Sequence, residues 1–199
     1  MMWLIRAPMA ALRDYVDHPD ARVASTNFIA LVVASNQPFY PFYFWWLVSD
    51  TIWPTYYTFL STPFFLAVPW LSRRYSIAGR ALLPLAGIGN TILCAKLFGV
   101  QSAVEIFLIP CAVLALLIYR PHERLVSFAL AGIAFFAYLL LSSRYGSPAH
   151  LYSAAEYAAL VRLNVVSAGM LTACAALIFS NLLAKAETSA KPDSGEIPS

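Results

Sequence analysis

The sequence predicts an all-α, polytopic membrane protein with six transmembrane helices and both termini in the cytoplasm. Composition is the first reason: 60% of the 199 residues are hydrophobic and only 12% are charged, whereas about a quarter of the residues in soluble proteins are charged. The second reason is a set of mostly apolar segments, each of roughly the 17 to 25 residues that cross a bilayer core. They span Thr26–Val48, Thr51–Leu71, Ala81–Phe98, Ala103–Tyr119, Leu125–Ser142 and Ala158–Leu183.

The basic residues predict the orientation of these segments. Of the 13 Lys and Arg residues, all but Lys96, Arg144 and Arg162 lie in alternate gaps. These are Arg6, Arg13 and Arg22, then Arg73, Arg74 and Arg80, then Arg120 and Arg124, and finally Lys185 and Lys191. Short basic loops remain in the cytoplasm, so both termini are expected on the cytoplasmic side of the membrane. The net charge of +3 then indicates topology and contact with anionic lipid, and no nucleic-acid partner is predicted.

Three regions follow along the chain. Residues 1–25 are expected to be a cytoplasmic segment, because Arg6 and Pro8 interrupt what would otherwise resemble a signal peptide. Trp3, Leu4 and Ile5 favour a short interfacial helix there, although a flexible leader fits equally well. Residues 26–184 form the membrane domain, and the polar residues 185–199 are expected to be a disordered cytoplasmic tail.

The first apolar segment contains an unusual pair of prolines, Pro38 and Pro41. Proline removes a backbone donor from the helix, so a kink is expected, and Asn36 and Gln37 are placed to bind the freed carbonyls. Either the bent helix lines a cavity near the membrane midplane, or the kink serves packing alone.

Aromatic residues gather at the predicted outer ends of the first two segments. An interfacial belt explains most of them, and an aromatic-walled pocket for an amphipathic molecule is the alternative. They are Tyr40, Tyr43, Trp45, Trp46, Trp53, Tyr56 and Tyr57.

Polar residues inside the apolar segments predict the binding site. Lys96 and Glu105 flank one short turn at similar depth, and an unpaired charge in the bilayer costs about 2.5 to 3.5 kcal/mol, so an ion pair is expected. The predicted ligand site, between the first, third, fourth and sixth helices, comprises Asn36, Gln37, Tyr40, Trp46, Asn90, Lys96, Glu105 and Asn164. The alternative for the asparagines is interhelical hydrogen bonding, worth about 0.6 kcal/mol each.

The sequence contains no HExxH motif, phosphate-binding glycine loop or Ser-His-Asp set at one depth, so no enzyme activity is expected. Its histidines fall in loops and its cysteines form no CxxC pair, so no metal or cofactor is predicted. The helix that contains the last apolar segment is expected to begin before the membrane, after Ser153, where a Ser cap and Glu156 suit a helix start. Small residues along it favour either a homodimer face or packing within the bundle; they are Ala168, Gly169, Thr172, Ala173 and Ala176.

Several short motifs in the middle of the chain resemble a known family. They are Gly89-Asn90, Leu97-Phe98-Gly99, the run from Ser102 to Pro110, the run from Leu116 to Arg120, and Glu123-Arg124. This pattern is similar to the six-helix membrane anchors of bacterial class III adenylate cyclases, and similar modules occur in autoinducer-sensing histidine kinases. The resemblance implies a module that receives a membrane-borne signal and passes it through its sixth helix, often as a dimer.

The expected function is therefore a bacterial inner-membrane sensor module that binds a small amphipathic or lipid-like ligand. Its partners would be membrane lipid, a second copy of the chain or another membrane protein. The alternatives are a structural subunit of a larger membrane complex and, with less support, a small dimeric transporter.

Overall fold

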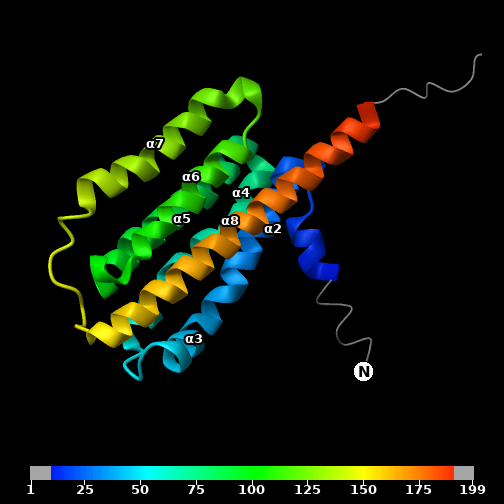
Figure 1. Cartoon of the computed structure of the whole chain (residues 1–199). Coiled ribbons are helices and arrows are strands. Elements are labelled where there is room, and N and C mark those ends of the chain that lie inside the picture. The colour runs from blue at the N-terminus through cyan, green and yellow to red at the C-terminus, as the bar shows by residue number, and fades with distance from the viewer. Residues whose placement is uncertain (1–9, 191–199) are drawn as a thin grey trace, which may run out of the picture.

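The computed structural model describes residues 10–190, and this part of the chain is a helical bundle without a β-strand (Figure 1). Residues 10–16 are helical and precede the bundle. The elements that follow are α2 (Ala21–Asn36), η1 (Gln37–Phe39), α3 (Tyr40–Leu47), η2 (Trp53–Ser61), α4 (Thr62–Arg74), α5 (Ser76–Phe98), η3 (Val100–Ser102), η4 (Val104–Phe107), α6 (Leu108–Leu117), η5 (Pro121–Glu123), α7 (Arg124–Leu141) and α8 (Ala154–Ala190).

Contacts between loops define one end of the bundle, which we call the Tyr152 end. The hydroxyl of Tyr152 donates to the carbonyl of Thr51 at 3.1 Å. The amide of Ala149 donates to the carbonyl of Leu97 at 3.0 Å. The turns after α3, α5 and α7 therefore meet at this end.

The opposite end, which we call the Arg120 end, joins the other connections. Arg120 forms an ion pair with Asp20 at 2.7 Å, and the hydroxyl of Tyr119 donates to the carbonyl of Ile77 at 3.2 Å. Arg73 donates to the carbonyl of Asp14 at 2.7 Å. The chain thus alternates between two ends, in the order that the apolar segments predict.

Three helices in residues 10–190 are long and apolar enough to cross a membrane, judged by length and composition: Ser76–Phe98, Pro121–Leu141 and Ala154–Thr188. Val104–Leu117 is apolar but shorter. The other predicted segments are interrupted. The first is divided by η1, which contains Pro38, and the second begins as the 3-10 helix η2 before α4. The prediction of a kinked first segment is confirmed, and the count of six spans stays a prediction.

Several boundaries differ from those predicted. α2 begins at Ala21 rather than near Thr26, because the side chain of Asp20 caps it by accepting from the amide of Arg22. α8 continues through residues 185–190, which we expected to be disordered. Its predicted start is confirmed, since Ser153 and Glu156 hydrogen-bond reciprocally at 2.7 and 3.3 Å. The proposed interfacial helix at Trp3–Ile5 lies outside the described residues.

The interior has two apolar clusters. The larger lies among α2, α4, α5, α6, α7 and α8, and includes Ile29, Val68, Leu83 and Ile118. The second cluster is at the Tyr152 end and is aromatic: the rings of Phe44 and Phe98 stack with centroids 5.5 Å apart. This aromatic cluster packs α3 and α5 against the start of α8.

Candidate functional site

The break between α2 and α3 places a buried polar side chain against the next segment. Gln37, the first residue of η1, donates from Nε2 to the hydroxyl of Ser61 at 2.6 Å and to the carbonyl of Thr58 at 3.2 Å. Its Oε1 accepts from the hydroxyl of Thr62 at 2.6 Å. All polar atoms of the Gln37 side chain are therefore satisfied by η2 and the start of α4.

Ser61 extends this network to α5. Its hydroxyl oxygen lies 2.9 Å from Oδ1 of Asn90 and 2.8 Å from the carbonyl of Thr58. The thiol of Cys94 also approaches Oδ1 of Asn90, at 3.9 Å. By contrast, Nδ2 of Asn90 has no hydrogen bond to any residue that the structure describes. One donor of the network is thus unused.

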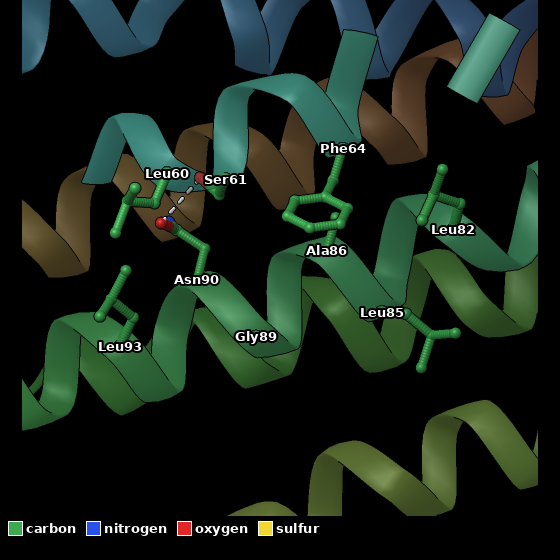
Figure 2. A pocket seen from close by; sticks show the side chains of 9 residues that line it. All are labelled: Leu60, Ser61, Phe64, Leu82, Leu85, Ala86, Gly89, Asn90 and Leu93. Atoms are coloured by element: carbon green, nitrogen blue, oxygen red, sulfur yellow. Dashed lines mark hydrogen bonds between the residues drawn. The ribbon is translucent and has the colours of Figure 1, made fainter. Parts of the chain in front are cut away.

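The Asn90 network forms the polar part of a groove between η2, α4 and α5, which we call the Asn90 groove, and the apolar side chains of Leu60 and Leu93 lie beyond it (Figure 2). The groove has a volume of about 410 Å³, within the range of pockets for small ligands. Ser61 and Asn90 are its only polar side chains among the described residues, and the hydrogen bond between them is drawn in Figure 2. The remaining lining residues are Leu60, Phe64, Leu82, Leu85, Ala86, Gly89 and Leu93.

A second polar cluster, at the Arg120 end, was missed by sequence reasoning. Arg80 is buried and forms a two-pronged ion pair with Glu123, with N–O distances of 2.6 and 2.8 Å. Its guanidinium also donates to the carbonyl of Ile118 at 2.9 Å and lies 4.8 Å from the ring centre of Tyr119. The pair therefore joins α5 to the α6–α7 connection.

Comparison with known proteins decides what kind of module this is. Residues 12–191 match the MASE7 family. The chain belongs to that family of membrane-associated sensor domains. No curated protein and no solved structure matches the chain.

The prediction of a membrane sensor module is thereby confirmed at the level of the MASE7 family. The resemblance to the membrane parts of particular cyclases and histidine kinases stays a prediction. In the described residues of this MASE7 domain, no group of three or more His, Cys, Asp or Glu side chains is arranged to hold a metal ion.

The structure brings together only two of the predicted site residues, Gln37 and Asn90, which Ser61 bridges. Asn36, the residue before Gln37, is exposed. Trp46 is 77% exposed on the outer surface, as an interfacial belt residue would be. Neighbouring aromatic side chains of the predicted belt are likewise exposed, namely Tyr43, Trp45, Trp53, Tyr56 and Tyr57.

Two other predicted residues contribute to packing at the Tyr152 end. The ring of Tyr40 packs edge-on against Phe98, with centroids 6.3 Å apart. Asn164 is buried in α8 and donates from Nδ2 to the carbonyl of Ser102 at 2.9 Å. Asn164 therefore makes the interhelical hydrogen bond that was the alternative to ligand binding.

The predicted Lys96–Glu105 ion pair is wrong. Lys96 donates instead to the carbonyls of Tyr145 and Ser147, at 2.7 and 3.2 Å. Oε2 of Glu105 accepts from the hydroxyl of Ser142 at 3.1 Å. Two residues with positive φ explain the difference, since Gly99 at 80° and Ala103 at 54° turn the chain between the two charges. Glu105 consequently faces α7 rather than α5.

Glu105 and Tyr145 form a small polar site near this turn. Oε1 of Glu105 and the hydroxyl of Tyr145 are both buried without a hydrogen bond in the structure. Burial, followed by the nearby carboxylate of Glu105, raises the pKa of Tyr145 to about 12. Tyr145 is therefore a neutral hydroxyl at physiological pH.

Proposed function

We propose that this MASE7 domain is a non-catalytic sensor that binds a small amphipathic molecule from the bilayer and changes helix packing in response. The single observation that supports a ligand is the Asn90 groove, whose apolar wall contains one polar site formed by Ser61 and Asn90. Ligand pockets are commonly apolar with a few placed polar groups. The family membership supports the sensor role independently.

The groove lies close to the break between α2 and α3, where we expect the packing to change when a ligand binds. Gln37 belongs to the break between α2 and α3, and its side-chain partner Ser61, the last residue of η2, lines the groove. A ligand at Ser61 and Asn90 would therefore act on the same hydrogen bonds that hold the break. It shifts the packing equilibrium only if its affinity differs between the two packings.

The signal would leave through α8. This helix has 37 residues, which at 1.5 Å per residue makes about 55 Å, well beyond a core of about 30 Å. It starts at the Tyr152 end, packs against α6 and α2, and runs past the Arg120 end (Figure 1). A shift of α8 would reach a cytoplasmic partner there.

We further propose six membrane crossings in a bacterial inner membrane, with the Arg120 end in the cytoplasm. Basic residues gather at that end, as the rule for short cytoplasmic loops requires. They are Arg22, Arg73, Arg74, Arg80, Arg120 and Arg124. The expected assembly is a homodimer.

Native mass spectrometry after gentle extraction from the source membrane tests this function. A homodimer that carries a reproducible small-molecule adduct would support the sensor. A fixed ratio to unrelated membrane chains, without an adduct, would contradict it and favour a structural subunit of a larger complex.

A further inference from the structure

We infer that the Asn90 groove selects an uncharged single-chain amphiphile with an oxygen head group, of the class of long-chain alcohols and monoacylglycerols. This inference rests on the proposed sensor function and specifies its ligand. It follows from three observations at the groove: an unused hydrogen-bond donor, the depth of that donor, and the absence of charge among the residues that line it.

The unused donor is Nδ2 of Asn90. Its Oδ1 already lies within hydrogen-bond distance of Ser61 and Cys94, while Nδ2 has no partner in the described residues. A polar group without a partner is unfavourable in hydrocarbon, where no water replaces the missing bond. A hydroxyl or ester oxygen at the polar part of the groove would supply the acceptor.

The depth of Asn90 excludes a charged head group. Asn90 precedes Phe98, the last residue of α5, by eight positions, which corresponds to about 12 Å along the helix axis. A bilayer-spanning α5 would hold this amide inside the hydrocarbon region. A carboxylate or ammonium group there would lose its hydration and would need a counter-charge.

No counter-charge is available in the groove. None of its lining residues is ionisable. The nearest cation along α5 is Lys96, whose Nζ is already held by the carbonyls of Tyr145 and Ser147. Fatty acids and cationic amphiphiles are therefore disfavoured, whereas an uncharged oxygen head group is accommodated.

The apolar part of the ligand has a defined place. The groove continues from Asn90 along α5 past Ala86 to Leu82, with Phe64 on the facing helix (Figure 2). Gly89 leaves room beside Asn90, since a Cβ built there meets no atom within 4 Å. A single acyl or alkyl chain fits this apolar stretch while its head group bonds to Asn90.

Photo-crosslinking of the full chain in lipid nanodiscs tests the inference. The probes are diazirine-bearing hexadecanol, hexadecanoate and hexadecyltrimethylammonium, and the readout is crosslinking to residues 81–93 by peptide mass spectrometry. We expect the alcohol to label this segment at least about fivefold more than either charged probe. Asn90→Leu should reduce the alcohol labelling about tenfold, the effect of losing one good hydrogen bond.

Gly89→Leu should abolish labelling by filling the groove. Gly132→Leu is its matched control on α7, because Gly132 likewise has no atom within 4 Å of a built Cβ, and it should label normally. Melting curves of both variants verify folding, and Gly89→Ala, which fills less of the groove, should give an intermediate result.

Two results would overturn the inference. Equal labelling by all three probes, still sensitive to Gly89→Leu, would reject the head-group class while leaving the sensor function intact. Labelling by the alcohol that is insensitive to Gly89→Leu would reject the groove as the site. Failure of the sensor function itself is distinguished by native mass spectrometry, which would then find no adduct of any class.

Discussion

Two ion pairs at the Arg120 end differ in how far water reaches them. The side chains of Arg80 and Glu123 are 3% and 10% exposed, whereas those of Arg120 and Asp20 are 49% and 21% exposed. Exposed pairs contribute little because water screens them. Removing one partner of a buried pair is costly, since it leaves the other charge without compensation.

Glu123→Gln is therefore expected to destabilise the protein by about 3 kcal/mol, because Arg80 would remain charged and buried. Asp20→Asn, its control at the exposed pair, should cost less than about 1 kcal/mol, including any loss of the α2 cap. Thermal unfolding in nanodiscs measures both. Equal losses of stability for the two substitutions would contradict this prediction, because they would show that the buried ion pair stabilises the protein no more than the exposed one.

Adjacent residues at the α2–α3 break provide a second contrast. Gln37 makes three side-chain hydrogen bonds, whereas its neighbour Asn36 is exposed. Gln37→Leu should lower the free energy of unfolding by about 1 to 2 kcal/mol, because it removes three hydrogen bonds of about 0.6 kcal/mol each. Asn36→Leu should leave it unchanged. A larger loss of unfolding free energy for Asn36→Leu than for Gln37→Leu would show that the side chain of Asn36 makes the more important contact.

At this scale the sequence predicted which polar residues are unusual, but not their partners. Gln37 and Asn90 are joined through the hydroxyl of Ser61, and their role in binding a ligand stays a prediction. The Lys96–Glu105 pair failed because the backbone at Gly99 and Ala103 adopts positive φ, which residue spacing does not reveal. Arg80 was assigned to a connection because the apolar segment begins at Ala81, although the helix α5 begins at Ser76 and contains Arg80.

At the scale of the elements, α4 and α5 pack very closely at Gly79 of α5, which lies against Ser72 of α4. A Cβ built on Gly79 would lie 2.4 Å from Cα of Ser72. Atoms at that distance overlap, and backbone atoms cannot move aside as a flexible side chain does. The two helices therefore depend on a residue without a side chain at this position.

Gly79→Ala should consequently reduce the free energy of unfolding by about 2 kcal/mol or more, as expected for overpacking. Gly89→Ala, on the same helix, should leave stability unchanged or slightly raised, because Ala favours helix and the site is open. Chemical or thermal unfolding of the two variants compares them directly. A stable Gly79→Ala variant would mean that the two helices separate easily.

The sequence predicted that every apolar segment is helical and that the first is interrupted, but it did not predict the 3-10 helix at the start of the second. α5, α7 and α8 are unbroken, while the segments that contain Pro38 and Pro54 include 3-10 turns. Proline predicts that a helix is disturbed, and packing decides whether the result is a kink or a 3-10 segment. The extent of α8 beyond Leu183 was underestimated because its polar end was read as a tail.

In the whole molecule, two sets of connections lie at opposite ends of one bundle. The Tyr152 end joins the turns after α3, α5 and α7. The Arg120 end joins the N-terminal segment to the turns after α4 and α6. If the bundle crosses the membrane six times, every residue of one set must face the same aqueous compartment.

Single cysteines test this arrangement in intact cells. After replacement of Cys94, Cys111 and Cys174 by alanine, an exposed residue in each connection is changed to cysteine and treated with a membrane-impermeant maleimide. The substitutions at the Tyr152 end are Asp50→Cys, Gln101→Cys and Ser147→Cys, and those at the Arg120 end are Tyr75→Cys, His122→Cys and Glu187→Cys.

The first set should react in intact cells, and the second only after the membrane is permeabilised. The physical reason is that the arginine-rich connections remain in the cytoplasm and hold the Arg120 end there. Reaction of all the second set in intact cells, with none of the first, would invert the orientation but retain the crossings. If some cysteines of one set react in intact cells and others of the same set do not, six crossings are contradicted. The connections at each end contact one another, so they cannot lie on opposite sides of a membrane.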